Sequence, residues 1–450
     1  MHKDNSLRSK MISLVIPIAF QQLMLALVSA SDAVMLGFVN QNAMAAVSLA
    51  GQYTFVYGLF MAALTIGCSM FTAQYWGKRD TAMLERILGY VLRFSIIISL
   101  CFMIAALLFP TQIMTILTNE VELIRDGSAY LRMVAPSYLL MGISQIYLCM
   151  MKNCQKAFDS TLISTVTVLL NIICNAILIF GVGKIPALGL YGAAIATVFA
   201  RVVEAIWAVI FLNTRLGIPL SRQTFFHTKG NFGHVFWKYT RPVLANELVW
   251  GCGFSMCSVI MGHLGADAVA ANSIANITKN LIICFSLGLS AGGGIIIGNE
   301  LGAGQIRQAE ENGKKLLVLA VWSGIGSGIL VLLSIPFILG MVNLTATAQN
   351  DLKWMLLISA YYLIGKSINS MTVGGIFPAG GDSRFGFLCD TVTLWCIVIP
   401  ISCVAAFVFK LPVLAVYFLL NLDEIIKLPV VIKHFHKHKW VKDLTEEAGK

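Results

Sequence analysis

Long apolar runs separated by short polar breaks dominate the chain. A membrane-spanning helix needs about 20 mostly apolar residues, and each run is long enough for one span. Twelve runs lie at residues 11–36, 45–75, 88–109, 130–151, 161–180, 189–213, 238–262, 274–298, 315–340, 353–377, 386–408 and 411–432. The pattern therefore predicts an all-α polytopic membrane protein with twelve transmembrane helices.

The two halves of the chain repeat each other when one is shifted along the other by half the total length. The shift aligns Pro17 with Pro242, Gly37 with Gly262, Gly67 with Gly292, Gly77 with Gly302 and Glu85 with Glu310. With a slip of two positions it also aligns Phe158, Asp159 and Ser160 with Gly381, Asp382 and Ser383. Six spans per half give both halves the same orientation in the membrane. The repeat thus predicts two pseudo-symmetric six-helix lobes, a parallel-repeat architecture typical of transporters.

Composition excludes most other protein classes. Hydrophobic residues make up 58% of the chain and charged residues 12%, against about 25% charged residues in soluble domains. A soluble enzyme is therefore excluded, and the long runs argue against the short alternating strands of an outer-membrane barrel. The 11 cysteines lie mostly in apolar runs, where they are expected to pack as small hydrophobic residues and not to bind a metal.

The net charge of +10 defines a topology. Twenty-three of the 32 lysines and arginines fall in the breaks or termini on one side, and five fall on the other. Because basic residues collect in cytoplasmic loops, both termini are expected in the cytoplasm of a multi-pass cell-membrane protein, with no nucleic-acid partner. The expected parts are an N-lobe at 1–213, a cytoplasmic linker at 214–237, a C-lobe at 238–432 and a basic cytoplasmic tail at 433–450.

Asp32 lies deep in the first run, and Pro17 precedes it in the same run by about four helical turns. A carboxylate inside a membrane is unfavourable unless it faces a polar cavity or binds a cation. Pro17 is predicted to bend the helix because proline removes a backbone hydrogen bond. We therefore expect Asp32 to be a protonatable or cation-binding group, the alternative being an acid that only caps the following loop.

Oxygen-bearing side chains recur in the fifth and sixth spans. Asn171 and Asn175 are four residues apart and share a helix face, and Thr197 lies in the next span. Carbonyl and hydroxyl oxygens suit a hard cation such as Na⁺. Polar contacts between helices would explain the same residues equally well.

Charged residues of the second half give a further set of candidates. Glu247 follows Pro242 in the seventh span, and Lys279 and Lys366 are its candidate partners. Glu247 is expected either to act in coupling or to form a structural ion pair with a lysine.

Other polar and small residues in the spans favour structural roles. Arg201 and Glu204, three residues apart, are expected to pair locally, and Asp390 is expected to be structural. Gly324 and Gly328 form a GxxxG pattern that favours close helix packing.

Several motifs resemble the MATE (multidrug and toxic compound extrusion) transporters. They are Asp32–Gly37 followed by Ala45–Val47, Gly262–Gly265 with Ala270–Asn272, Gly298–Gly302, Ala379–Arg384, and Trp395 with Pro400. The resemblance covers nearly the whole chain. It implies export of organic cations or other amphiphiles in exchange for H⁺ or Na⁺.

The resemblance also implies a cation site in the first lobe, where Asp32, Asn171 and Thr197 match the family's positions. Asn175 stands where the family has an aspartate, which leaves Asp32 as the main titratable group. In the tenth span, where another branch of the family has an aspartate, this chain has Lys366 and Ser367.

The leading functional hypothesis is a monomeric antiporter that exports small cationic or amphiphilic molecules by rocking of two lobes, in contact with membrane lipid. It needs no cofactor other than the coupling ion. The alternative is a flippase for lipid-linked precursors, which would need a strongly cationic cavity. A membrane-embedded enzyme is less favoured, because the spans lack a cluster of His, Asp and Ser at catalytic spacing.

Overall fold

The computed structural model describes residues 2–39, 41–183, 186–221, 224–225, 231–342 and 344–448, without the side chains of residues 2–6, 29–30, 32–34, 37, 39, 41 and 448. All regular secondary structure in these ranges is helical. The chain forms two compact units. The N-terminal unit is Leu23–His234, and the C-terminal unit is the chain up to Gln22 together with Val235–Ala448.

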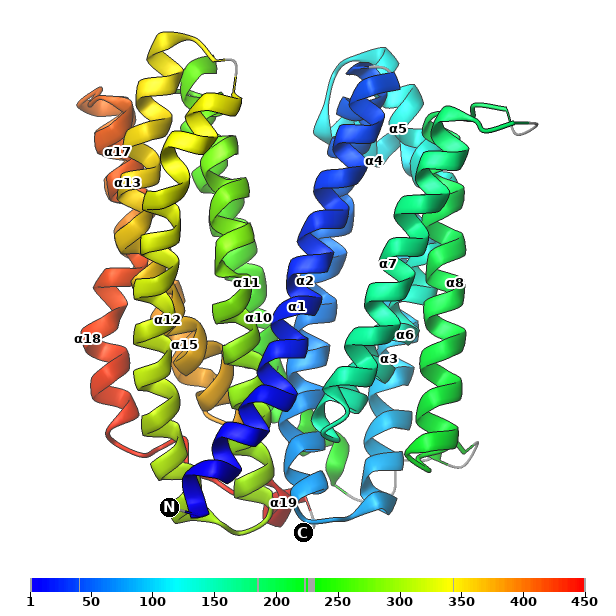
Figure 1. Cartoon of the computed structure of the whole chain (residues 1–450), viewed down its shortest axis with the longest axis vertical. Coiled ribbons are helices and arrows are strands. Elements are labelled where there is room, and N and C mark those ends of the chain that lie inside the picture. Colours follow the sequence, from blue (N-terminus) through cyan, green and yellow to red (C-terminus); the bar gives the residue numbers. More distant parts are fainter. Residues whose placement is uncertain are drawn as a thin grey trace. The chain divides into compact units, whose positions relative to one another are not determined.

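The helices of the two units are shown in Figure 1. Helix α1 (His2–Val39) contributes to both units. The N-terminal unit continues with α2 (Gln41–Gly77), α3 (Thr81–Leu108), α4 (Pro110–Leu117), α5 (Val121–Val134), α6 (Pro136–Asn153), α7 (Ala157–Phe180) and α8 (Leu190–Arg215). The C-terminal unit has α10 (Phe232–Gly262), α11 (Ala266–Gly302), α12 (Ile306–Met341), α13 (Ala346–Asn369), η1 (Ser370–Ile376), α14 (Phe377–Ala379), α15 (Ser383–Asp390), η2 (Thr391–Val398), α16 (Ile399–Cys403), η3 (Val404–Val408), α17 (Val413–Leu420), α18 (Asp423–Phe435) and α19 (Leu444–Ala448), where η marks a π-helical segment.

Ten of the twelve predicted spans are long and apolar enough to cross a membrane, counted within the described ranges. Nine are helices that each pass this test alone, and the tenth is the pair α5 and α6, bent by 49°. The bend lies at Ala135, directly before Pro136, which begins α6. Proline disfavours a helical conformation at the preceding residue, which explains a break at this position.

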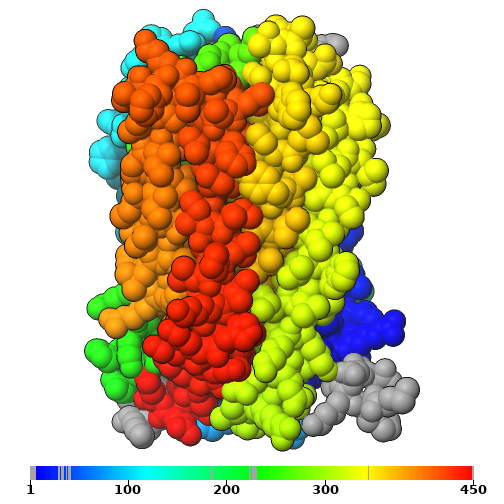
Figure 2. All heavy atoms as spheres, turned by 90° about the vertical axis from the view of Figure 1, so that its left-hand side faces the viewer, coloured from blue at the N-terminus to red at the C-terminus, as the bar shows by residue number. Residues whose placement is uncertain are grey.

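The two remaining predicted spans, 353–377 and 411–432, are helical but more polar. The first is formed by α13, η1 and the start of α14, and it carries Lys353 and Lys366. The second is broken between α17 and α18, and α18 begins with Asp423 and Glu424. Figure 2 shows α17 and α18 as one continuous band between the η2–α16 segment and helices α12 and α13. The broken pair thus occupies the place of one span.

The first part of α1 packs against α11 of the C-terminal unit. A Cβ atom on Gly288 would lie 2.5 Å from the Cα of Ala19, and one on Gly292 would lie 2.8 Å from a methyl group of Val15. Only glycines allow this approach. Residues up to Gln22 therefore group with the second half of the chain, whereas the expected N-lobe, 1–213, assigned them to the first.

Backbone geometry supports the internal repeat. Arg79 (φ 61°) and Gly304 (φ 73°) are related by the half-length shift, and each forms a left-handed turn between consecutive helices. Gln155 (φ 61°) and Gly381 (φ 75°) form a second such pair, with a slip of only one position from the same shift. The sequence comparison aligned Asp159 with Asp382 by a slip of two positions. The second pair corrects that alignment, because Asp159 lies in the first turn of α7, whereas Asp382 precedes the first turn of α15.

The basic segment after residue 433 packs against the C-terminal unit as far as the structure describes it. The indole of Trp440 is fully buried and stacks on Phe435 with ring centroids 5.5 Å apart. Lys238 donates a hydrogen bond of 2.8 Å to Glu447, which lowers the pKa of that carboxyl. The lowered pKa means that this contact stabilises the fold above the ordinary glutamate pKa of about 4.3 and is lost as pH falls through the lowered value.

The predicted packing role of Gly324 and Gly328 is confirmed. A Cβ on Gly324 would lie 2.8 Å from the Cα of Ile364, and one on Gly328 would lie 2.8 Å from the carbonyl oxygen of Ala360. Both partners belong to the backbone of α13. The glycines therefore let α12 and α13 approach backbone to backbone, as small residues do in membrane bundles.

Replacing Gly324 with alanine should lower the thermal stability of the protein, since the added methyl group meets backbone that cannot move aside. Overpacking of this kind costs about 1–3 kcal/mol. Gly326→Ala is the matched control, because nothing lies within 4 Å of its Cβ position and alanine favours the helix. Equal melting temperatures for the two variants in detergent would contradict the packing role.

Candidate functional site

The N-terminal unit encloses a cavity of about 400 Å³. Helices α1, α2, α5, α6, α7 and α8 contribute to its wall. About half of the described lining residues are apolar, such as Leu25, Val28 and Met141. The polar part of the wall consists of Ser48, Thr54, Tyr130, Ser137, Tyr138, Thr167, Asn171, Thr197, Arg201 and Glu204. A pocket of this size that combines apolar surface with polar groups is typical of small-molecule sites.

Two of the four residues predicted to form the cation site, Asn171 and Thr197, line this cavity together. The amide nitrogen of Asn175 donates a hydrogen bond of 3.2 Å to the side-chain oxygen of Asn171, one helical turn away. The hydroxyl of Thr197 donates to the carbonyl oxygen of Ala193 at 2.9 Å, and its lone pairs can still coordinate a cation. Asp32 belongs to α1, and its side chain lies outside the described residues.

Tyr138 of α6 lines the cavity, and other aromatic residues pack behind it. The hydroxyls of Thr54 and Tyr138 are 3.0 Å apart, and Tyr57 donates to the carbonyl oxygen of Tyr138 at 2.8 Å. The rings of Tyr53, Tyr57 and Phe102 pack nearby with centroids 5.2 Å apart in each pair with Phe102. The hydrogen bonds hold Tyr138 in one orientation, and aromatic rings attract organic cations.

Arg201 and Glu204 form the predicted local ion pair on α8, which confirms that prediction. A guanidinium nitrogen lies 2.7 Å from the carboxylate of Glu204. Ser144 donates a second hydrogen bond of 3.0 Å to the same carboxylate oxygen. The charges of the pair cancel, so the described part of the cavity wall carries no net charge.

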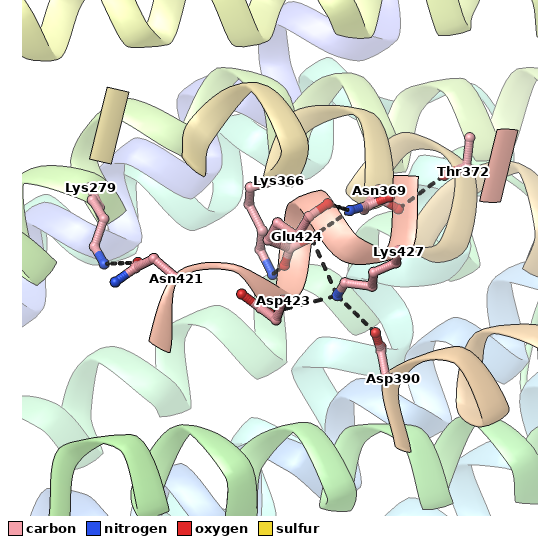
Figure 3. A network of polar contacts seen from close by, with 9 residues as sticks. All are labelled: Lys279, Lys366, Asn369, Thr372, Asp390, Asn421, Asp423, Glu424 and Lys427. Atoms are coloured by element: carbon pink, nitrogen blue, oxygen red, sulfur yellow. Dashed lines mark hydrogen bonds and ion pairs between the residues drawn. The ribbon is translucent and has the colours of Figure 1, made fainter. Parts of the chain in front are cut away.

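A network of charged side chains crosses the C-terminal unit (Figure 3). We define the α18 network as Lys366, Asn369, Asp390, Asp423, Glu424 and Lys427. Its centre is the fully buried Glu424, which lies 3.1 Å from the ammonium of Lys366 and 3.3 Å from that of Lys427. Asn369 donates a hydrogen bond of 2.7 Å to the same carboxylate.

Lys427 is the second cation of the α18 network. It is buried and lies 2.8 Å from Asp390 and 3.8 Å from Asp423. Three carboxylates thus share two lysines. A buried charge is tolerated only when it is paired and hydrogen-bonded, and the network satisfies this condition. It also confirms the structural role expected of Asp390.

The two lysines expected as partners of Glu247 are occupied elsewhere. Lys366 pairs with Glu424, and Lys279 lies 3.3 Å from Asn421 and 4.9 Å from the ring of Tyr362. Glu247 itself makes no hydrogen bond or ion pair within the described part of the chain. The structural ion pair considered for Glu247 is therefore wrong, although Lys366 attracts and Asp390 repels its carboxylate at longer range.

Sequence reasoning missed the centre of the α18 network. Asp423, Glu424 and Lys427 lie in the twelfth run, 411–432, whose other residues are mostly apolar. A signal was present: Asp423, Glu424 and Lys427 have the three- and four-residue spacing of one helix face. A mixed-charge face inside an apolar run indicates buried pairing.

Two π-helical segments begin at residues of the α18 network. Segment η1 starts directly after Asn369, and η2 starts directly after Asp390. Widened π turns inside helices frequently occur at functional sites. Pro17, by contrast, lies inside α1, which continues as one helix from His2 to Val39. Its role as a bend stays a prediction.

Comparison with known proteins identifies the family. The family model described as MatE matches residues 17–177 and again residues 242–404. The chain belongs to the MatE family. The two matches begin at Pro17 and Pro242, the prolines that the internal repeat aligns. The sequence resemblance to this family is thereby confirmed, and the chain is a multi-pass membrane protein of a multidrug efflux transporter family, not an enzyme.

Several relatives of this MatE chain are similar over most of their length. An uncharacterized transporter of Bacillus subtilis, YisQ, is 22% identical over 87% of this chain and 86% of its own length. A probable multidrug resistance protein of Thermotoga maritima, NorM, is 21% identical over 99% and 96%. Multidrug and toxin extrusion protein 1 of Xenopus tropicalis is 23% identical over 98% and 75%.

Solved structures share the MatE fold. A mutant of the Vibrio cholerae MATE transporter VcmN has a TM-score of 0.89 at 16% identity, covering 99% of both chains. A MOP superfamily transporter from Pyrococcus furiosus has a TM-score of 0.88 at 16% identity, covering 98% of this chain and 97% of that one. These likenesses support the twelve-helix, two-lobe layout.

Removing the charge of Glu424 should destabilise the protein strongly, because it leaves Lys366 without its carboxylate. Losing one partner of a buried pair costs about 3–5 kcal/mol, so Glu424→Gln should unfold at a clearly lower temperature in detergent. Glu247→Gln is the control: it breaks no ion pair and should stay within about 0.5 kcal/mol of wild type. An equal loss in both variants would contradict these contacts.

Proposed function

We propose that the chain exports organic cations or other amphiphilic molecules across the cell membrane in exchange for H⁺ or Na⁺. Both termini lie in the cytoplasm in this proposal, and the protein works as a monomer with no cofactor other than the coupling ion. The cavity of the N-terminal unit carries the proposal most directly. It combines apolar side chains, the rings of Tyr130 and Tyr138 and cation-compatible oxygens in about 400 Å³, within the range of about 300–1,000 Å³ usual for small-molecule sites.

The coupling group in this proposal is Asp32. It follows Val28 by four residues and Leu25 by seven, the spacing of residues on one helix face, and both of these residues line the cavity. Asn171, Asn175 and Thr197 would supply the neutral oxygens of the proposed site. An organic cation and the coupling ion would then compete for the same carboxylate. Such competition links outward movement of one to inward movement of the other.

The contacts of the two asparagines favour H⁺ over Na⁺. Asn171 already accepts a hydrogen bond from Asn175 through its side-chain oxygen, the atom that would coordinate Na⁺. An aspartate at position 175 would have added a second negative charge to the site. The proposed site has one carboxylate, that of Asp32, and the side-chain oxygen of Asn171 already accepts a hydrogen bond. Protonation of Asp32 is therefore the simpler way to neutralise the charge of the site.

Glu247 is the second candidate, in the C-terminal unit. A carboxylate without an ion pair can take up a proton without breaking one, whereas Glu424 cannot. We assign Lys366 to the support of Glu424 and Lys279 to a polar contact beside Tyr362 and Tyr417. Alternating access by rocking of the two lobes, with Pro17 as a bend in α1, completes the proposed cycle.

Asp32→Asn should abolish exchange, since it removes the charge for which substrate and coupling ion compete. Proteoliposomes loaded with an organic cation dye such as ethidium would be given inward H⁺ and Na⁺ gradients together, and dye efflux would be followed by fluorescence. The expected rate is that of protein-free liposomes. Asp126→Asn, in a surface pair with Arg125, should transport normally. Normal exchange by Asp32→Asn would overturn the proposed role of Asp32.

A further inference from the structure

Three sulfur atoms meet between α2 and α6, which pack against each other in the N-terminal unit. The Sγ of Cys68, on α2, lies 3.7 Å from the Sδ of Met150, on α6. The thiol of Cys149, also on α6, forms a hydrogen bond with the thiol of Cys68. We define the sulfur cluster as Cys68, Cys149 and Met150. All three residues are buried, with Cys68 and Met150 at 0% exposure and Cys149 at 5%.

Hydrogen-bond donors surround the sulfur cluster. The hydroxyl of Thr72 donates to the Sδ of Met150 at 3.1 Å and lies 3.5 Å from the Sγ of Cys68. The side-chain amide of Asn153 donates to the Sγ of Cys149 at 3.4 Å. A donor directed at a sulfur atom favours its charged form. The surroundings of the sulfur cluster are therefore more polar than those of cysteines that only fill space.

The spacing of the sulfur atoms suits two ligands of one metal ion. Two metal–sulfur bonds of about 2.3 Å at a tetrahedral or trigonal angle place their sulfur atoms about 3.8–4.0 Å apart. The sulfur atoms of Cys68 and Met150 are 3.7 Å apart. An ion could therefore enter between these ligands with little movement of α2 and α6.

The kind of ligand selects a soft metal ion. Thiolate and thioether sulfur bind Cu(I) in preference to hard ions such as Mg²⁺. In the part of the chain that the structure describes, no group of three or more His, Cys, Asp and Glu side chains could hold a metal ion. Such a group is what a structural zinc site requires. Two thiolates and a thioether, by contrast, are a sufficient set for Cu(I).

The charges of the site also suit a monovalent ion. Binding releases the proton of each thiol to the solvent, so two thiolates and one Cu(I) ion leave a single negative charge. The ammonium of Lys152, on α6, attracts a thiolate at Cys149. A buried charge is tolerated when it is paired and hydrogen-bonded. Lys152 and Asn153 meet both conditions.

The sulfur cluster lies toward the ends of both helices. Cys68 precedes Gly77, the last residue of α2, by nine positions, and Cys149 precedes Asn153, the last residue of α6, by four. In the proposed orientation these ends face the cytoplasm, where thiols are kept reduced. The two thiols thus stay available to a metal ion and do not join in a disulfide.

We propose that Cys68, Cys149 and Met150 form a binding site for Cu(I). The ion links α2 to α6, the two helices that Tyr57 and Tyr138 also link through a hydrogen bond. This role replaces the expectation from the sequence that these cysteines only pack as small hydrophobic residues. The proposed antiport does not require the ion.

Competition with a coloured chelator tests the proposal. The purified protein is mixed with Cu(I), ascorbate and increasing bathocuproine disulfonate in the absence of oxygen, and the absorbance reports the copper held by the chelator. The double variant Cys68→Ser, Cys149→Ser should retain one copper ion fewer per protein than the wild type. The matched control, Cys101→Ser with Cys252→Ser, changes two exposed cysteines and should retain as much copper as the wild type.

Two further measurements identify the ligands. Met150→Leu keeps both thiols and nearly the same side-chain volume, and it should release the copper at a lower chelator concentration than the wild type. X-ray absorption of the copper-loaded wild type should show sulfur neighbours at about 2.3 Å and no nitrogen neighbours. Melting temperatures measured without copper verify that the variants are folded.

Three results would overturn the proposal. They are copper retention by the double serine variant equal to that of the wild type, an equal loss of copper in the control, and nitrogen neighbours around the copper. The last result would place the ion on histidines and not on the sulfur cluster. Transport is not part of the readout, so failure here leaves the antiport proposal untouched.

Discussion

The cost of placing charge inside a bilayer shapes both units of this MatE protein. Ionised groups in a membrane must be paired, hydrogen-bonded or directed at a polar cavity. In the C-terminal unit, Glu424 meets this requirement through Lys366, Lys427 and Asn369. In the N-terminal unit, Glu204 meets it through Arg201 and Ser144. The contacts of Glu424 with Lys366 and Asn369, and of Glu204 with Ser144, hold helices together.

The same constraint separates structural charges from candidates for transport. Glu247 carries a carboxylate without an ion pair among the described residues, and Lys279 has an amide and two aromatic rings as neighbours instead of a carboxylate. Asp32 joins the candidates through its spacing from Val28 and Leu25. A group that can change its charge without breaking a buried pair suits coupling, because its protonation need not destabilise the fold.

Local patterns predicted much of the fold. Hydropathy found the runs, the half-length shift found the repeat, and the spacing of Gly324 and Gly328 found the contact between α12 and α13. The pair Arg201 and Glu204 was predictable because both residues lie on one helix. The partner of Lys366 was not, since Glu424 lies 58 positions away on another helix, and no pattern in a single sequence specifies such a pair. The folded segment around Trp440 was hidden for the same reason.

The central claim is that inward H⁺ movement drives export through the N-terminal unit. The most direct test is to impose a pH gradient and a Na⁺ gradient separately across proteoliposomes and to measure dye efflux under each. The account predicts efflux with the pH gradient alone and none with the Na⁺ gradient at equal pH on both sides. Efflux that requires Na⁺ and ignores the pH gradient would contradict it.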